Sequence, residues 1–290
     1  MTVKIFQAVE YRVSNGIAVI TMNNPPVNGL NHPIRQGLVD AFKQARGDST
    51  VKAIVLAGAG RGFSAGGDIR EFGTPAAAAA PALSLHVHPV IEDSEKPVVA
   101  AIHGLAIGGG LETALVCHYR IAAADTKVGL PELKLGMIPL SGTQRLPRVL
   151  GLARAIKMIL GGELRLAREL ADTALFDQVI EGDAAAVLDT AIVFARGKIG
   201  TAPLPLIRHR PLPDVDAAQI LAAARARLAT QDADNFMARE GLNAIAATVE
   251  TSNFDAGMAV ARAIYDRLVA TDEVRKQKER FFAARYSEPP

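Results

Sequence analysis

The hydrophobic positions of this chain fall in short runs that glycine and proline separate, a pattern typical of alternating strands and helices. Residues 98–102 are apolar and partly β-branched, a run long enough for one buried strand and too short for a helix. Gly108, Gly109 and Gly110 then open an apolar segment, residues 111–116, that suits a helix. We therefore expect a buried strand, a glycine-rich turn and a helix in this order.

The same patterns predict the elements of the rest of the chain. Residues 10–22 read as a hairpin around Asn15-Gly16, a strong two-residue turn signal, and Pro33 suits the first position of a helix. Further strands are predicted over residues 52–57, 120–124, 127–130 and 177–180. Helices are predicted over residues 33–46, 146–160 and 184–198, and residues 165–174 are amphipathic.

Residues 200–214 contain four prolines and form the clearest linker of the chain. Beyond this linker, helices are predicted over residues 215–228, 235–249, 255–268 and 271–285. The sequence therefore predicts an α/β core over residues 1–199, the proline-rich linker, and an all-helical C-terminal segment over residues 215–290.

The three glycines suit a turn that binds a negatively charged group. Backbone N–H groups at a helix start have no partner inside the helix, and the helix dipole favours negative charge there. Without a Cβ, glycine lets another group approach these N–H groups closely. Gly108, Gly109 and Gly110 are therefore expected to hold an anion or a polarised carbonyl oxygen.

Two carboxylates accompany this turn, each among apolar residues. Glu112 lies in the first turn of the predicted helix, and Glu132 follows Pro131. An isolated carboxylate in apolar surroundings is costly unless it is paired or has a chemical task. Taken singly, each is equally well explained as an acid that complements a helix dipole.

A second glycine-rich turn, S-A-G-G-D, covers residues 64–68. The preceding Gly58-Ala59-Gly60 suggests a dinucleotide-binding turn, but Phe63 stands where the third glycine of that motif is expected. We therefore reject the dinucleotide interpretation.

The segments I-H-G-L-A-I-G-G-G-L-E and G-L-P-E-L-K-L-G-M-I-P, together with F-S-A-G-G-D-I upstream, resemble the enoyl-CoA hydratase/isomerase (crotonase) family. The likeness covers residues 22–182 and is greatest to the hydratase half of bifunctional hydratase/3-hydroxyacyl-CoA dehydrogenases. The motif F-F-A-A-R, at residues 281–285, resembles the end of that half. The resemblance implies an α/β fold, a crotonase-like spiral of β-β-α units with C-terminal helices that cover the acyl site or build a trimer contact.

The resemblance also implies roles for individual residues. The backbone N–H groups of Gly67 and Gly109 would bind the thioester oxygen, Glu112 would activate water, and Glu132 would protonate Cα. Further contacts with the substrate would come from Ala65, Gly66, Asp68, Ile69, Arg70 and Gly108.

One departure from the family concerns the residue after Pro139. Hydratases of the family usually carry a glycine there, but this chain has Leu140 and a loop one residue shorter. Three functions therefore stay open. They are 2-enoyl-CoA hydratase, Δ3-Δ2-enoyl-CoA isomerase or another enolate-forming acyl-CoA enzyme, and a non-catalytic subunit.

Several side chains have competing interpretations. Asp68 is expected to cap the following helix, and Arg70 either meets a CoA phosphate or is simply solvated. His86 and His88 form an H-x-H pair for which we favour packing or surface over metal binding. Cys117 is expected to be a buried core thiol.

Two segments are also ambiguous. Residues 75–81, alanines between two prolines, are either a mobile segment over the acyl site or a spacer. The charge run over residues 273–280 is expected to be a solvated face.

Composition limits the partners. The chain has 290 residues, of which 49% are hydrophobic, and its net charge of +2 gives no electrostatic case for nucleic acid. One cysteine excludes an internal disulfide. The first ten residues lack the apolar region of a signal peptide, and no apolar run is long enough to span a membrane. The C-terminal residues S-E-P-P do not match a peroxisomal targeting signal. We therefore expect a cytoplasmic protein. The family resemblance, rather than composition, implies that no metal or redox cofactor is needed and that CoA is part of the substrate. It also implies a homo-oligomer, trimer or hexamer, and leaves a separate 3-hydroxyacyl-CoA dehydrogenase open as a partner.

Overall fold

The computed structural model describes residues 3–71, 74–272, 275–276, 279–280 and 283. Its contacts divide the chain into two compact units, residues 1–128 with 165–207, and residues 129–164 with 208–290. The expected division of the chain at residues 199 and 214 stays a prediction. Three predicted features lie partly outside the described residues. They are the F-F-A-A-R motif, of which only Ala283 is described, the predicted helix over residues 271–285, and the charge run over residues 273–280.

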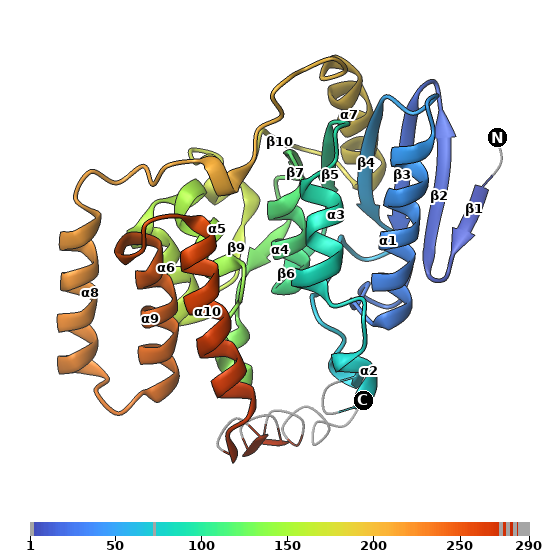
Figure 1. Cartoon of the computed structure of the whole chain (residues 1–290). Helices are drawn as coiled ribbons and strands as arrows, with labels where there is room; N and C mark the ends of the chain where they lie inside the picture. The colour runs from blue at the N-terminus through green and yellow to red at the C-terminus, as the bar shows by residue number, and fades with distance from the viewer. Residues whose placement is uncertain (1–2, 72–73, 273–274, 277–278, 281–282, 284–290) are drawn as a thin grey trace. The chain divides into compact units, whose positions relative to one another are not determined.

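The first unit contains a seven-stranded sheet in the order β1-β2-β3-β4-β5-β7-β10 (Figure 1). Strands β1 to β3 pair antiparallel, and β3 to β10 pair parallel. The strands are β1 (Val3–Phe6), β2 (Val9–Ser14), β3 (Ile17–Met22), β4 (Ala53–Gly58), β5 (Val98–Ile102), β7 (Tyr119–Ala123) and β10 (Gln178–Ile180). The predicted hairpin over residues 10–22 and the predicted strands over 52–57, 98–102, 120–124 and 177–180 are confirmed.

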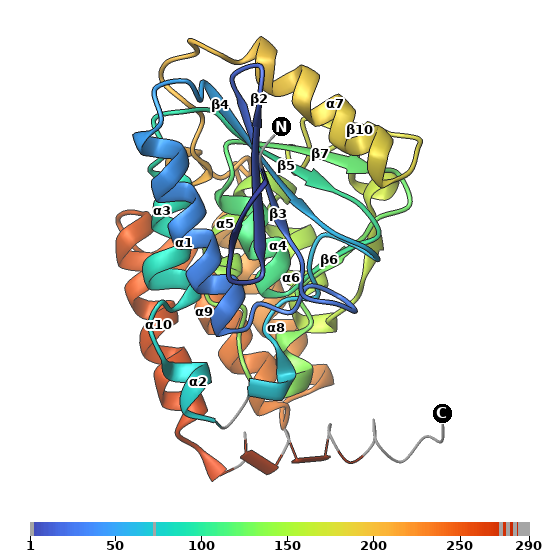
Figure 2. The same cartoon turned by 90° about the vertical axis from the view of Figure 1, so that its right-hand side faces the viewer.

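The central strands β4 and β5 are apolar and almost wholly buried, and helices lie on both sides of the sheet (Figure 2). Val19, Val55 and Val99 point to one face and pack in a core with Val187 and Ala191 of α7 (Ala184–Gly197). On the other face, α1 (His32–Gly47) contacts β1, β2 and β3. Because both faces of these strands are buried, their sequences do not alternate between apolar and polar residues.

Short elements connect this sheet to the glycine-rich turns. They are α2 (Pro75–Ala78), a π-helical turn (Leu83–Val87), α3 (His88–Glu92), β6 (Leu105–Ile107), α4 (Gly109–Val116), β8 (Lys127–Gly129) and β9 (Arg165–Leu166). Strands β6, β8 and β9 form a second, three-stranded sheet. The amphipathic segment over residues 165–174 is thus a short strand followed by a 3₁₀ turn, Ala167–Leu170, and the segment over 75–81 holds one helical turn.

The second unit is helical. It contains a 3₁₀ turn (Glu132–Leu135), α5 (Gly142–Leu150), α6 (Leu152–Gly161), α8 (Ala217–Gln231), α9 (Phe236–Glu250) and α10 (Phe254–Val269). The single helix expected over residues 146–160 is wrong, because Gly151 has φ +83° and separates α5 from α6. Left-handed backbone at this glycine ends one helix before the next begins.

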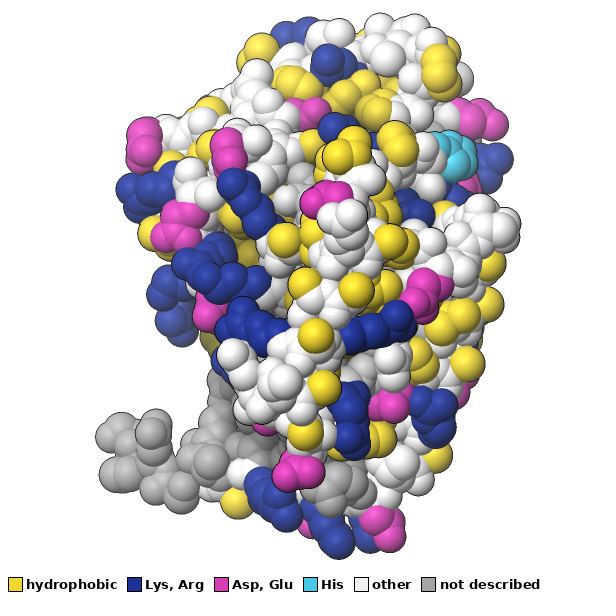
Figure 3. Space-filling view, turned by 90° about the vertical axis from the view of Figure 1, so that its left-hand side faces the viewer, with side chains coloured by type: hydrophobic (Ala, Val, Ile, Leu, Met, Phe, Trp, Pro, Cys, Tyr) yellow, Lys and Arg dark blue, Asp and Glu magenta, His cyan; other side chains and the backbone are white. Residues whose placement is uncertain are grey.

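The described surface agrees with the balanced charge. Basic and acidic side chains are mixed on the face in Figure 3. None of the helices described is both long and apolar enough to span a bilayer.

Candidate active site

The two glycine-rich turns lie side by side in the first unit. Ser64 forms an isolated parallel bridge with Ala106 of β6. The Ile107 N–H donates to the Ser64 carbonyl at 2.9 Å, and the Ser64 N–H donates to the Leu105 carbonyl at 3.1 Å. Pairing with β6 therefore brings residues 64–67 against residues 107–110. The sequence predicted this proximity only through the family resemblance.

The orientation of the Gly67 N–H is set by the peptide that it shares with Gly66. The Leu30 N–H donates to the Gly66 carbonyl at 2.8 Å. In a trans peptide the carbonyl and the following N–H point in opposite directions. Because Leu30 holds the carbonyl on its own side, the Gly67 N–H points away from Leu30. Gly66 adopts φ +87°, which glycine tolerates without strain.

The Gly109 N–H is oriented in the same way at the start of α4. The Glu112 N–H donates to the Gly108 carbonyl at 3.0 Å, so that carbonyl points along the helix and the Gly109 N–H points out of its N-terminus. A Cβ built on Gly109 would lie 3.6 Å from the Gly67 nitrogen. Among the described residues, neither of these two N–H groups donates a hydrogen bond.

A polar loop that the sequence did not assign to the site supports the first turn. Asn28, with φ 52°, donates through its amide to the carbonyls of Ala59 and Gly62, each at 2.8 Å. The Ser64 hydroxyl donates to the Asn28 carbonyl at 2.7 Å. Asparagine tolerates left-handed backbone, so an asparagine shortly after two prolines was the available signal.

The two predicted acids occupy the two units. Glu112 lies in the first turn of α4 and is buried, with 7% of its surface exposed. Glu132 begins the 3₁₀ turn of the second unit, where its carbonyl accepts from the Met137 N–H at 3.1 Å. That the two carboxylates act on one substrate stays a prediction.

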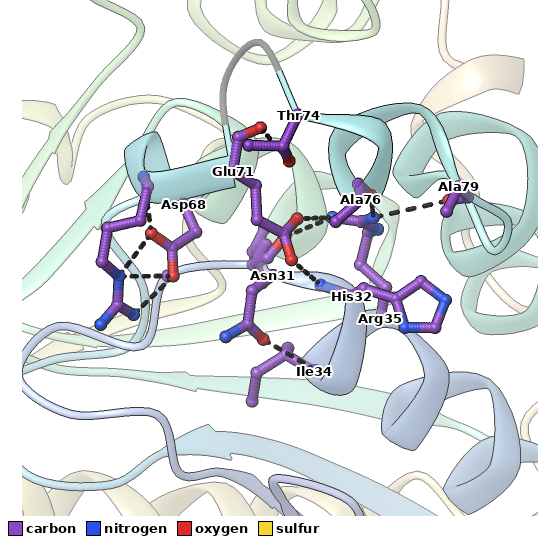
Figure 4. Close-up of polar contacts among 12 residues, drawn as sticks. Asn31, His32, Ile34, Arg35, Asp68, Glu71, Thr74, Ala76 and Ala79 are labelled. Carbon is purple, nitrogen blue, oxygen red and sulfur yellow. Dashed lines mark hydrogen bonds and ion pairs between the residues drawn. The ribbon is translucent and has the colours of Figure 1, made fainter.

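The remaining candidates lie on the first turn and after it. The Ala65 N–H donates to the Val27 carbonyl at 2.9 Å. Asp68 accepts from the Arg70 N–H at 3.0 Å and from its guanidinium at 2.6 Å (Figure 4), as expected of a residue that caps the 3₁₀ turn Ile69–Glu71. These bonds hold the pKa of the Asp68 carboxyl below its usual value. Arg70 stays 61% exposed, so its contact with a CoA phosphate remains a prediction. Nothing is described of the Ile69 side chain.

The other titratable candidates have structural surroundings. Cys117 is buried, and burial raises the pKa of its thiol to about 12, which confirms a core thiol. His88 is buried with Nε2 3.3 Å from the Thr113 hydroxyl, whereas His86 accepts from the Ala82 N–H. Within the described part of the chain, no group of three or more His, Cys, Asp or Glu side chains is placed to hold a metal ion.

The sequence profile of the enoyl-CoA hydratase/isomerase family matches residues 12–206, more than half of the chain. The chain belongs to this family. The human peroxisomal bifunctional enzyme is 37% identical over 281 residues, which make up 94% of this chain and 38% of that enzyme. A probable enoyl-CoA hydratase of Bacillus subtilis is 44% identical over 173 residues, 58% of this chain and 67% of that protein.

The crystal structure of an enoyl-CoA hydratase/isomerase from Pseudoalteromonas atlantica matches with a TM-score of 0.71 at 22% identity. The match covers 96% of this chain and 97% of that chain, and it concerns the fold. The predicted fold class, crotonase-like α/β with C-terminal helices, is thereby confirmed. This member of the enoyl-CoA hydratase/isomerase family spans well under half of the human relative's length.

Proposed function

We propose that this chain hydrates 2-trans-enoyl-CoA thioesters. The observation that carries the proposal is that the N–H groups of Gly67 and Gly109 belong to two turns that lie side by side in the first unit, where neither N–H group donates a hydrogen bond among the described residues. Conjugate addition of water drives negative charge onto the thioester oxygen, and two fixed donors stabilise that charge more in the transition state than in the ground state.

Glu112 and Glu132 would carry out the proton transfers. Glu112 takes a proton from water while the hydroxyl oxygen bonds to Cβ, and the electron pair of the double bond moves toward the thioester. Glu132 then supplies a proton to Cα. Two carboxyl groups in different environments can hold opposite protonation states. The buried position of Glu112 supports such a role, since a closed site keeps bulk water away from the reacting groups.

Isomerisation of a 3-enoyl-CoA is the second candidate, and Leu140 favours it. Leu140 is buried, with 7% exposed, in the turn before α5, where its carbonyl accepts from the Thr143 hydroxyl at 3.0 Å. A bulky apolar side chain in place of glycine would crowd or dry the position of the added water. Isomerisation moves a proton between two carbons and needs no added water.

The chemistry of the family supports a place for this chain in fatty-acid β-oxidation, where the hydrated product is the substrate of a 3-hydroxyacyl-CoA dehydrogenase. The human relative carries the name of a bifunctional enzyme, and a separate dehydrogenase partner for this shorter chain remains part of the proposal. CoA would enter only as part of the substrate.

The test is an assay of crotonyl-CoA and of a 3-enoyl-CoA with purified protein. We expect the absorbance of the conjugated thioester to fall with crotonyl-CoA. Glu112→Gln and Glu132→Gln should each lower kcat by about 10²–10⁴-fold, because general acid–base catalysis contributes about that much. Glu181→Gln, at an exposed position after β10, is the matched control and should keep the activity of the original chain.

Unchanged crotonyl-CoA absorbance together with turnover of the 3-enoyl-CoA would replace hydration with isomerisation. No turnover of either thioester by the folded protein would support the non-catalytic subunit instead.

A further inference from the structure

We infer that Arg35 is a positioning residue. It orients the Gly67 N–H and fixes the segments whose leucine side chains, Leu30 and Leu83, lie beside Gly109. The inference rests on the proposed function, since it assigns Arg35 a task in the binding of the thioester oxygen. Arg35 lies on α1, far along the chain from either glycine, and acts through other residues.

The Arg35 guanidinium is bonded on all three of its nitrogens, and only 6% of the residue is exposed. Figure 4 shows Arg35 beside Glu71, Ala76 and Ala79. Its Nε donates to the Pro81 carbonyl at 2.8 Å, and Nη2 donates to the Ala76 carbonyl at 2.8 Å. Its Nη1 donates to the Leu30 carbonyl and to Glu71 Oε2, each at 2.9 Å. Such an array needs the planar, five-donor fork of arginine, and lysine cannot reproduce it.

One of these bonds leads directly to the first donor of the proposed oxyanion site. Arg35 holds the carbonyl of Leu30, while the N–H of Leu30 holds the Gly66 carbonyl at 2.8 Å. That carbonyl belongs to the peptide whose N–H is the Gly67 donor. Two hydrogen bonds and one residue therefore separate Arg35 from the donor, and a shift of Leu30 would rotate the peptide.

The other bonds lead to the surroundings of Gly109. A Cβ built on Gly109 would lie 3.0 Å from Leu83 Cδ2 and 3.5 Å from Leu30 Cδ1. Leu83 comes two residues after Pro81, whose carbonyl Arg35 binds at 2.8 Å. Arg35 thus ties together the segments that carry both of these leucines.

Glu71 completes the arrangement from the end of the first turn. It accepts from Arg35 through Oε2 and from the His32 N–H through Oε1 at 2.7 Å. Asp68 and Glu71 belong to one short turn, in which the Glu71 N–H donates to the Asp68 carbonyl at 3.0 Å. The residues on both sides of Gly67 are therefore anchored to the start of α1.

The consequence for catalysis is preorganisation. Donors that are already aimed at the developing oxyanion cost no reorganisation during the reaction, so loosening them lowers kcat more than it weakens ground-state binding. A purely structural arginine would change the stability of the protein and leave both kcat and KM as they are.

The test compares Arg35→Lys with Arg46→Lys, a matched arginine on the same helix whose side chain is 67% exposed. For Arg35→Lys we expect kcat with crotonyl-CoA to fall about tenfold or more, because removal of one such donor costs about 10²–10³-fold. KM should stay within about threefold. The infrared shift of the bound thioester carbonyl should become smaller than in the original chain, and Arg46→Lys should match the original chain in all three.

The inference is overturned if folded Arg35→Lys keeps kcat and the carbonyl shift of the original chain. If Arg35→Lys does not fold, Glu71→Gln is the deciding variant, since its amide satisfies only one of the two donors that Glu71 now accepts from. For Glu71→Gln we then expect a smaller fall in kcat and a smaller loss of the infrared carbonyl shift. If neither change is seen, the inference is overturned. An original chain that neither turns over an enoyl-CoA nor polarises its carbonyl contradicts the proposed function itself.

Discussion

At the residue scale, neighbouring glycines of one turn have different physical tasks. A Cβ on Gly110 would lie 2.4 Å from the Ser64 carbonyl oxygen, a distance that backbone cannot accommodate. A Cβ on Gly109 would meet only the tip of Leu83 at 3.0 Å, and the next atoms are 3.5 Å or more away. Gly110 therefore allows the two turns to pack, whereas Gly109 keeps the space beside the N–H donors open.

We predict that Gly109→Ala and Gly110→Ala separate these tasks. Gly109→Ala should fold with little loss of stability and lose most of the proposed hydratase activity, because its methyl group would lie 3.6 Å from the Gly67 nitrogen and fill the space beside the two N–H groups. Gly110→Ala should lower the free energy of unfolding by about 1–3 kcal/mol, as overpacking of a close contact does. Thermal unfolding and crotonyl-CoA turnover measure the two effects, and full activity of Gly109→Ala would contradict the assignment.

The sequence predicted the glycines but not their supports. Gly67 and Gly109 stand in motifs whose turn chemistry is local. The Arg35 bond to the Leu30 carbonyl spans five residues, but the bonds from Asn28 to Ala59 and from Arg35 to Pro81 join segments 31 and 46 positions apart, and no local pattern marks these distant partners. Arg35 in particular lies inside the predicted helix over residues 33–46, where nothing in the sequence distinguishes it from an ordinary helix residue.

At the scale of elements, α6 begins without a capping side chain of its own. Its N-cap residue is Gly151, which has no side chain to accept from the first N–H groups. Asp214 supplies the missing acceptor, since its Oδ2 accepts from the Leu152 N–H at 2.8 Å. The last residue of the proline-rich segment thus caps a helix that lies well before it in the chain, a pairing that only folding creates.

We predict that Asp214→Ala lowers the free energy of unfolding by about 1 kcal/mol, the usual cost of losing an N-cap. Asp214→Asn should retain most of the stability, because its amide oxygen can still accept. The matched control is Asp216→Ala, since exposed Asp216 at the start of α8 makes no capping bond through its side chain. Chemical denaturation measures all three, and equal stability of Asp214→Ala and Asp216→Ala would refute the capping role.

At the scale of the whole molecule, folding couples to pH through a buried histidine. His118 is 2% exposed, with Nδ1 accepting from the Val98 N–H at 2.9 Å and Nε2 lying 3.2 Å from the Glu92 carbonyl. Burial lowers the pKa of His118 to about 4 from an ordinary value of 6.5. Between these values the unfolded chain binds a proton that the folded chain does not.

We predict that the free energy of unfolding falls as pH drops from about 6.5 toward 4, by up to about 3 kcal/mol from this residue. Above pH 6.5 the histidine is neutral in both states and contributes no slope. His118→Asn, whose oxygen can accept from Val98, should flatten the acid slope by nearly one proton. His209→Gln, at an exposed position, should leave it unchanged. An equal slope in both variants would show that other groups cause the acid sensitivity.

The association state also belongs to this scale, and it stays a prediction. Val260 and Val269 on α10 are each 40% exposed, and Phe236 at the start of α9 is 36% exposed. Apolar side chains of this kind on the C-terminal helices suit the contact between subunits that the family resemblance implies.

By itself, the sequence determined the elements and the chemical vocabulary of this protein. Local periodicity and turn residues suffice for the strands, the hairpin at Asn15-Gly16, most of the helices, and the two glycine-rich turns with their acids. Tertiary structure alone decided which segments meet. It capped α6 with Asp214, placed segment 129–164 with the C-terminal helices, and brought Leu30 and Arg35 to the Gly67 peptide. The reason is that a hydrogen bond between distant segments depends on how strands and helices pack, and residue spacing along the chain carries no record of that packing.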